Sequence, residues 1–492
     1  MNALTMNRSV PDPRRDLRRR RRLASLGCVV AAVVTLAGCA SFSADGGFAT
    51  VEQTARDRLG KDLRWSRSDA DQDAIDLRVA ALLAKPLSVD DAVQVALLNN
   101  RGLQASFHEL GIGEADQVQA GRLPNPGVSF GRLRRGDEVE LERGLHFNLA
   151  RLLAMPITQR MEARRFEQTK GLVALNVLSL AADTRKAYYL ALAAEESVRY
   201  MRQVKQAAQA SAELALRMLQ VGNFNKLQQA RQQVFEADAA IGLARAEQAQ
   251  RATRERLTRL MGAWAGQTQF NLPERLPDLP KDVLDLPDIE PMALAQRLDV
   301  QGAKRAAEQT ARNLGLTRST RFINVLELGL RHNTSNQMPS QRGWEIGFEL
   351  PLFDWGDARV ARAESIYMQA VQRAAETAVN ARSEVREAYT AYRTAYDLAR
   401  YQRDQLVPLN QRIAEENLLR YNGMLIGVFE LLADARTQIA SVNGAILALR
   451  DFWLAQADLD MALIGKPSLM SATDAASAAG MTTAPGATGA GH

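Results

Sequence analysis

The stretch "WEIGFELPLF", residues 344–353, decides the fold of this 492-residue chain. Large apolar side chains occupy every second position, and the positions between them hold two Glu, a Gly and a Pro. The apolar set is Trp344, Ile346, Phe348, Leu350 and Leu352. A period of two is that of a β-strand, so the stretch predicts a strand with one apolar face and one carboxylate-bearing face.

Three further segments alternate in the same way, at 128–134, 139–149 and 322–332. In the second of these, Val139, Leu141, Leu145, Phe147 and Leu149 share one face, opposite Glu140, Glu142, His146 and Asn148. Arg143 is the exception on the apolar face, and we expect it near an interface. Segments of about ten residues with this pattern are typical of transmembrane β-strands. Trp344, and the pair Phe353 and Trp355 one strand length later, fit aromatic anchors at two membrane interfaces.

Ordinary hairpins packed on a soluble core would show the same alternation, but the strand length and the export signal described below favour the membrane. Four strands in lipid would leave two unpaired edges, so closure demands several chains. Two chains would supply eight strands and three would supply twelve. We therefore expect Glu345 and Glu349 to face water inside a barrel built by several subunits. The lipid-facing residues would be Trp344, Ile346, Phe348 and Leu350.

The N-terminus has the three regions of a cleaved export signal. A basic stretch, "RRDLRRRRR" at 14–22, precedes the apolar run 23–38, which is short for a bilayer span. "LAGC" at 36–39 resembles the bacterial lipobox, in which cleavage precedes the cysteine and lipid is attached to it. A nucleic-acid-binding arm and a retained membrane anchor are the alternatives, and the order of the regions favours the signal. We expect covalent lipid on Cys39 and no other cofactor.

The signal also accounts for the basic pI of about 9.4. Residues 1–38 hold eight of the 62 basic and two of the 56 acidic residues, which leaves 54 of each in the mature chain. This charge balance does not indicate binding to nucleic acid or to an acidic partner surface. Cys28 lies in the signal and Cys39 is the expected lipid site, so the mature chain cannot form an internal disulfide.

Self-similarity indicates a duplication. "ALLNNRGLQA" at 96–105 matches "ALAQRLDVQG" at 293–302, and "LMG" at 260–262 recurs as "LIG" at 463–465. Apolar and small residues at steps of three and four predict long helices with a coiled-coil seam, at 156–221 and 357–421. Shorter helices at 88–122, 225–262, 291–320 and 427–465 would stack end to end beside them. Pro408 should kink or break its helix.

The expected fold is mainly α with transmembrane β: a long α-helical barrel plus a β-barrel completed by trimerisation, from two internal repeats that each supply two β-strands. The order is signal peptide 1–38, lipidated periplasmic segment 39–86, first repeat 87–262 with its hairpin at about 126–150, Pro-rich equatorial linker 263–290, second repeat 291–466 with its hairpin at about 322–353, and disordered tail 467–492. Five prolines between 271 and 291 exclude a single helix there. The tail is poor in bulky apolar residues.

The chain resembles the TolC-like outer membrane efflux family, in its branch of lipoprotein channels of tripartite resistance-nodulation-division pumps. The resemblance rests on "LSVDDAVQVALLNN" at 87–100, "AGRLPNPGVSFG" at 120–131, "FELPLFDWGDARVARAES" at 348–365 and "RYNGMLIGVFELLADARTQIA" at 420–440. "AGRLPNP" is more similar to the heavy-metal-efflux branch. The family implies a homotrimer in the cell outer membrane, lipid-anchored and extending into the periplasm. It also implies a periplasmic adaptor and, through it, an inner-membrane transporter as partners.

The same resemblance implies roles for two helix turns and two acids. Val221, Gly222 and Asn223, with Asn422, Gly423 and Met424, correspond to the periplasmic tips where the adaptor docks. Family gates use acidic residues just past the second tip, and Glu430 and Asp434 are the nearest candidates. Both could equally be ordinary solvated charges, four residues apart on one helix face.

An enzyme is the first rival class. The four His, at 108, 146, 332 and 492, lack metal-ligand spacing, and no nucleophile elbow, phosphate loop or cysteine pair is present in the sequence. We expect no catalytic residue and no metal site. The function that fits best is passive conduction of drugs or metal ions from a periplasmic pump and adaptor to the exterior. A duct for type I protein secretion and a non-conducting coiled-coil lipoprotein remain as alternatives.

Overall fold

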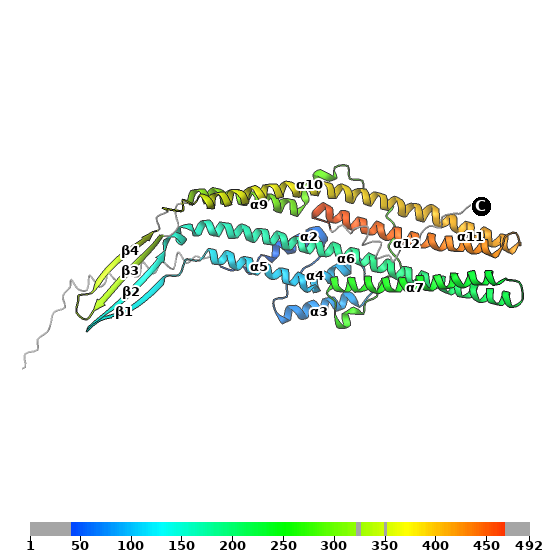
Figure 1. Ribbon diagram of the computed structural model, residues 1–492, viewed down its shortest axis with the longest axis horizontal. Helices are drawn as coiled ribbons and strands as arrows, with labels where there is room; N and C mark the ends of the chain where they lie inside the picture. The colour runs from blue at the N-terminus through cyan, green and yellow to red at the C-terminus, as the bar shows by residue number, and fades with distance from the viewer. Residues whose placement is uncertain (1–40, 321–325, 349–351, 468–492) are drawn as a thin grey trace, which may run out of the picture. The chain divides into compact units, whose positions relative to one another are not determined.

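The computed structural model describes residues 41–320, 326–348 and 352–467. Several predicted features lie outside these ranges: the signal peptide, the lipid site Cys39, the strand positions Glu349 and Leu350, and the tail from residue 468. The described chain is mostly helical with one small sheet (Figure 1). It divides into two compact units. The first comprises Met1–Gly46, Ile112–Phe166 and Gly315–Ala361 and holds the sheet, and the second holds the remainder.

The sheet of the first unit is antiparallel with the order β1-β2-β3-β4. Its strands are β1 (Gly127–Arg135), β2 (Glu138–Asn148), β3 (Leu326–Ser335) and β4 (Gln341–Phe348), labelled in Figure 1. A two-residue turn joins β1 to β2, and Gly136 takes the positive φ of 60° that such a turn requires. The two hairpins pair with each other through β2 and β3, and β1 and β4 are the outer strands.

Alternation located all four strands, but two predicted strand ends are wrong. The stretch 344–353 was expected to be strand throughout, whereas β4 ends at Phe348 and both Leu352 and Phe353 lie in a bend. The second error is at the end of β2. Leu149 was expected on the apolar strand face, but it begins helix α6. The Asn148 Oδ1 atom accepts a hydrogen bond of 2.8 Å from the backbone N–H of Arg151, which caps the new helix. Cap formation therefore ends the strand one residue early.

The two halves of the chain carry the same order of helices around their strands. The first half has α4 (Val89–Asn99), α5 (Arg101–Ala120), α6 (Leu149–Gln220) and α7 (Lys226–Met261). The second half has α8 (Ile289–Gln296), α9 (Leu298–Thr320), α10 (Asp357–Tyr401), α11 (Val407–Asn422) and α12 (Val428–Ile464). None of the helices in the described ranges combines the length and the apolar character needed to cross a bilayer.

Two segments predicted as single helices are each broken once. The breaks lie at Asn100, with ψ 116°, and at Arg297, with ψ 123°. Asn100 ends α4 and caps α5, because its Oδ1 accepts a 3.0 Å hydrogen bond from the N–H of Leu103. The sequence match at 96–105 and 293–302 places these two residues at equivalent positions.

Pro408 interrupts its helix as predicted. A π-helical turn, Gln402–Leu406, separates α10 from α11, and Pro408 lies in the first turn of α11. The backbone stays helical through this junction, with Tyr401, Leu406 and Val407 all in the right-handed region, and the wider turn accommodates a proline that cannot donate to the helical ladder. Pro156 differs, since it lies inside α6, which begins seven residues before the predicted start at 156.

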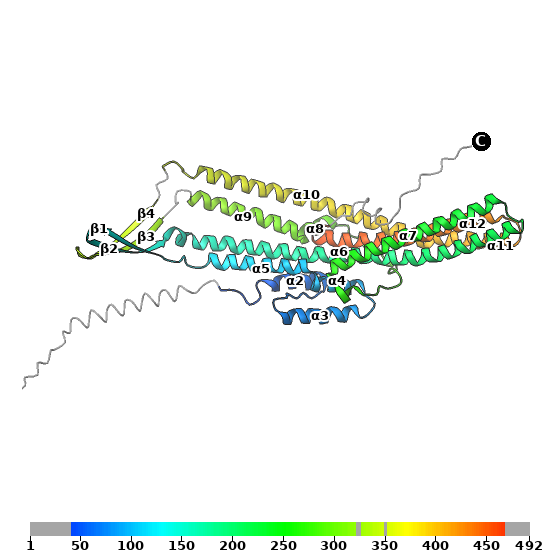
Figure 2. The ribbon, with the colours of Figure 1, turned by 60° about the horizontal axis from the view of Figure 1, so that its bottom comes forward.

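The segment before the first repeat folds against it. It contains α2 (Phe48–Leu59) and α3 (Asp69–Leu83), and α3 packs beside α4 (Figure 2). The side chain of Ser68 caps α3 and that of Ser88 caps α4, each by accepting from a backbone N–H three residues later.

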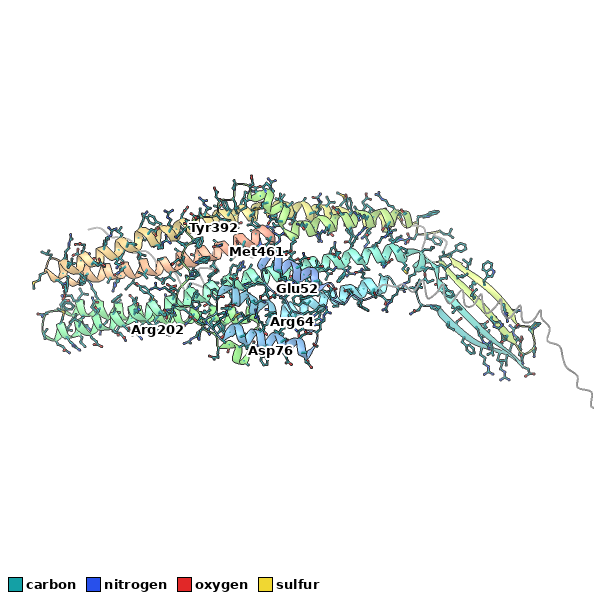
Figure 3. The ribbon with its side chains drawn as sticks, turned by 180° about the vertical axis from the view of Figure 1, so that it is seen from behind. Glu52, Arg64, Asp76, Arg202, Tyr392 and Met461 are labelled. Atoms are coloured by element: carbon teal, nitrogen blue, oxygen red, sulfur yellow. The ribbon has the colours of Figure 1, made fainter. Side chains whose placement is uncertain are left out.

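The Pro-rich segment 263–290 lies along the helices of the second unit. Its apolar residues Phe270 and Leu276 are buried in the larger core cluster. The indole N–H of Trp453 on α12 donates to the carbonyl of Pro277 at 2.9 Å. Tyr392 on α10, labelled in Figure 3, accepts a 3.2 Å hydrogen bond from the N–H of Leu284. Helix side chains therefore satisfy backbone groups that a proline-rich segment cannot pair internally.

Candidate functional site

The register of the sheet sorts its side chains into two chemically different faces. Leu145 lies opposite Leu330, which lies opposite Trp344, and in the next row Leu328 lies opposite Ile346. Directly paired residues of neighbouring strands point to the same face. The predicted alternation is therefore confirmed for Trp344, Ile346 and Phe348, whose side chains are all exposed in the single chain.

The apolar face is free of charge only over the half of the sheet that connects to the helices; toward the turns Phe130, Leu141 and Val139 share it with cations. In the half near the helices its three rows are Leu326 and Phe348; Phe147, Leu328 and Ile346; and Val128, Leu145, Leu330 and Trp344. Toward the hairpin turns, Arg143 lies opposite His332, which lies opposite Arg342. Arg132 and Arg134 of β1 continue this cationic end. The exception noted in the sequence, Arg143, is thus part of a band.

The opposite face is polar and acidic. Its ionisable residues are Glu138, Glu140, Glu142, Glu327, Glu345, Arg135, Arg331 and His146. Five carboxylates against two guanidiniums give a formal charge of −3 with His neutral. Arg331 pairs with Glu345 at 2.5 Å, and Asn333 donates to Glu140 at 3.0 Å. This polar face is suited to line a water-filled space, and its net negative charge would attract cations.

Glycines on the polar face make room for His146. The Ser129 Oγ and His146 Nε2 atoms lie 2.9 Å apart. A Cβ atom on Gly144 would lie 2.3 Å from Ser129 Oγ, and one on Gly329 would lie 3.3 Å from His146 Nδ1. The position of the His146 imidazole therefore requires glycine at two neighbouring sites, Gly144 on β2 and Gly329 on β3. The sequence analysis missed this group, because the register between β2 and β3 cannot be read from either strand alone.

In the second unit, the turn between α6 and α7 has the geometry of a tight helix reversal. Val221 is exposed, and Gly222 has a φ of +80°. The N–H of Asn223 donates to the carbonyl of Met218 at 2.8 Å, which closes the end of α6. Asn225 and Gln228 then form a reciprocal capping box at the start of α7.

The turn between α11 and α12 differs in the residue that takes the left-handed conformation. Gly423 has a φ of −80°, outside the left-handed region. Met424 takes the positive φ of 60° instead, and its side chain is 93% exposed. The N–H of Leu425 donates to the carbonyl of Arg420 at 2.9 Å. A methionine held in a costly conformation thus presents its thioether to solvent.

The gate candidates lie on the same helix but in different surroundings. Glu430 is exposed in the first turn of α12, where the helix dipole favours an anion. Asp434 is half-buried and accepts a hydrogen bond from the side chain of Asn417 on α11. The structure therefore gives Asp434 a role within its own helix pair that the sequence did not indicate.

The helix pairs α6–α7 and α11–α12 contact one another near these turns. The guanidinium of Arg436 on α12 lies 4.7 Å from the ring centroid of Phe235 on α7. A cavity of about 510 Å³ lies beside this contact. It is lined by Leu227, Ala230, Arg231, Gln232, Val234, Ala433 and Arg436. Leu227 and Val234 are the large apolar residues of this lining, and the others are small or polar.

Two buried ion pairs join helices that are far apart in sequence. Lys186 of α6, 2% exposed, donates to Asp458 of α12 at 2.8 Å. Burial raises the pKa of the Asp458 carboxyl, and Lys186 offsets part of that rise. Arg297, 1% exposed, donates to Asp299 and to Glu384 of α10, each at 2.7 Å. Burial opposes the charge of Arg297, but these two acids raise its pKa above the ordinary value.

Comparison with known proteins agrees with these features. No protein-family model matches the chain. Cobalt-zinc-cadmium resistance protein CzcC of Cupriavidus metallidurans is 25% identical over 284 residues, which cover 55% of this chain and 64% of CzcC. The CmeC outer membrane channel of Campylobacter jejuni superposes with a TM-score of 0.62 at 16% identity, covering 85% of this chain and 92% of CmeC. The MtrE outer membrane channel of Neisseria gonorrhoeae gives 0.64 at 18% identity, with coverages of 77% and 89%.

The chain has the TolC-like channel fold. The resemblance drawn from the sequence is thereby confirmed at the level of fold. A TolC-like fold explains why one small sheet interrupts otherwise helical repeats, which was the problem posed by residues 344–353. Barrel closure, the tips and the gate stay predictions.

Proposed function

We propose that this chain is the outer membrane channel of a tripartite efflux system. In this proposal three chains associate, and their sheets close into a barrel of about twelve strands. The observation that carries the proposal is the register of the sheet, which separates an apolar face from an acidic face while leaving β1 and β4 with free edges. Such edges are satisfied in lipid only when the sheet closes.

The polar face then lines an aqueous lumen through which solutes diffuse passively. The driving force lies in partners, an inner-membrane transporter and a periplasmic adaptor. The excess of carboxylates on this face favours cationic cargo. The similarity to a cobalt-zinc-cadmium resistance protein points the same way, toward divalent metal ions rather than drugs.

The two helix turns are the proposed docking points for the adaptor. Both present exposed apolar side chains at a sharp reversal, Val221 at one and Met424 with Leu425 at the other. Glu430 and Asp434 are the proposed constriction. Replacing both by Ala should raise the conductance of the closed channel, whereas unchanged conductance would remove these two acids from the gate.

Localisation follows from the same scheme. The chain is proposed to be lipid-anchored through Cys39 in the outer membrane, with its helices in the periplasm. Metabolic labelling with a radioactive fatty acid should mark the wild-type chain and leave the Cys39→Ser variant unlabelled. Label on both chains, or on neither, would contradict the lipid site.

Ion entry into proteoliposomes tests the function. Vesicles of phosphatidylcholine carry a zinc-sensitive dye in one preparation and an iodide-quenched dye in another. We expect the wild-type protein to admit Zn²⁺ faster relative to iodide than a variant with Glu138, Glu140 and Glu142 changed to Gln. The matched control, Arg135→Gln with Arg331→Gln, removes cations from the same face and should shift the ratio the other way. Entry of neither ion with any variant would support the non-conducting lipoprotein instead.

A further inference from the structure

Charge on the sheet is divided between its faces. Within the described strands the apolar face carries no carboxylate, and its ionisable side chains are Arg132, Arg134, Arg143, Arg342 and His332. Every Glu of the four strands lies on the other face. Within the described strands, therefore, no acid of the same face neutralises these cations.

Two of these guanidiniums lie on either side of one histidine. Arg143 faces His332, and His332 faces Arg342 on the next strand. All four Arg are exposed, and none has a carboxylate within ion-pair distance in the described part of the chain. The covered Nε2 atom of His332 has no hydrogen-bond partner there either. This row lacks a counter-charge.

The neighbours of the row restrict what could supply it. Leu145, Leu330 and Trp344 form the next row along the same strands. A ligand that covers both rows needs an anionic end on the Arg side and an apolar end on the Leu and Trp side. Guanidinium groups pair with phosphate through two parallel N–H···O bonds, so a phosphorylated headgroup can supply the anionic end.

We propose that three arginines of the cationic band, Arg132, Arg143 and Arg342, bind the phosphate groups of membrane lipid headgroups. The inference rests on the proposed function, because it needs the apolar rows to face acyl chains. The band lies at the hairpin turns, and the opposite ends of the strands connect to the helices. If the helices lie in the periplasm, the bound headgroups belong to the outward-facing leaflet. The band then fixes the depth of the sheet in the bilayer.

Thermal stability of the purified full-length protein in detergent tests the proposal with three probes. These are lipid A, which carries phosphates on its sugar headgroup; dephosphorylated lipid A with the same acyl chains; and inorganic phosphate. We expect lipid A alone to raise the melting temperature. Equal stabilisation by the dephosphorylated lipid would overturn the proposal, and so would equal stabilisation by inorganic phosphate. This comparison needs no variant.

Variants then locate the site. Arg132→Gln, Arg143→Gln and Arg342→Gln together should weaken lipid A binding on the order of 100-fold, since each cation near an anionic surface contributes roughly a factor of five. Arg135→Gln with Arg331→Gln, on the opposite face, should leave the affinity unchanged. Equal loss in both variants would contradict the assignment. Ion entry into phosphatidylcholine vesicles distinguishes failure of the lipid site from failure of the channel proposal. A protein that conducts but does not respond to lipid A would support the channel and contradict the lipid site. A protein that neither inserts nor conducts would contradict both.

Discussion

Arginine at Ile346 should prevent stable insertion of the sheet, whereas arginine at the next residue, Gly347, should not. Ile346 lies in the middle of the three apolar rows, opposite Leu328. Gly347 lies on the polar face, where an added Cβ would be 3.9 Å from the Cβ of Glu327. The space there accepts a side chain, and a guanidinium would have a carboxylate beside it.

The magnitude follows from the position of each residue relative to lipid. An Arg on the lipid face of a transmembrane barrel costs about 2–4 kcal/mol at the bilayer midplane and about 0–1 kcal/mol near the interfaces. Ile346 is two apolar rows below the cationic band, which places it nearer the midplane. A cost of about 2–4 kcal/mol shifts the insertion equilibrium roughly 30- to 1000-fold, and each subunit of the proposed trimer carries it. At Gly347 we expect a change of less than about 1 kcal/mol.

Insertion of the denatured chain into phosphatidylcholine vesicles measures this difference. The inserted fraction is read from flotation with the vesicles after an alkaline wash. We expect Gly347→Arg to match the wild type and Ile346→Arg to remain in the unbound fraction. The reasoning would be refuted if both variants inserted equally well, because the face assignment would then have no consequence in lipid.

Three further predictions concern the second unit, and melting in detergent checks each. Arg297→Met leaves the partly buried carboxylates of Asp299 and Glu384 without their shared cation and should cost about 3 kcal/mol, whereas Arg382→Met, which breaks an exposed pair, should cost less than about 1 kcal/mol. Equal costs would contradict the role of Arg297 as a buried cation. Gly222→Ala forces a φ of +80° on a side chain and should cost about 1–2 kcal/mol, while Gly171→Ala inside α6, with open space around it, should stabilise by about 0.5–1 kcal/mol. Burial raises the pKa of Asp458, so its ionisation disfavours the folded state: its contribution is present below the ordinary value of 3.8 and is lost as pH rises through the folded pKa. The stability of Asp458→Asn relative to wild type should therefore increase as pH rises above about 4, and a decrease would reverse the assigned shift.

Local patterns predicted the elements of this fold well. Alternation located all four strands and the two faces, because the side-chain period of a strand is a local property of the backbone. Pro408 predicted the break between α10 and α11, because the effect of a proline on a helix is also local. The helix breaks at Asn100 and Arg297 were missed, since Asn100 is a capping residue inside an apolar pattern that continues across it.

Features that depend on distant pairing could not be predicted. The cationic band is visible only once β2 is aligned with β3, because Arg143 and His332 are remote in sequence and each alone reads as an isolated exception. The Lys186 and Asp458 pair requires the relative rotation of α6 and α12, which helical periodicity does not fix. At the second turn the left-handed residue is Met424 and not the neighbouring Gly423, and the hydrogen bonds at the end of α11 that accompany this conformation cannot be read from the sequence.

Single-channel conductance in a planar bilayer, measured together with the mass of the same purified protein in detergent, tests the central claim most directly. The account predicts a trimer that inserts and conducts, with a low conductance in the absence of its adaptor. A monomer that neither inserts nor conducts would contradict it and return the two hairpins to a soluble, lipid-tethered scaffold.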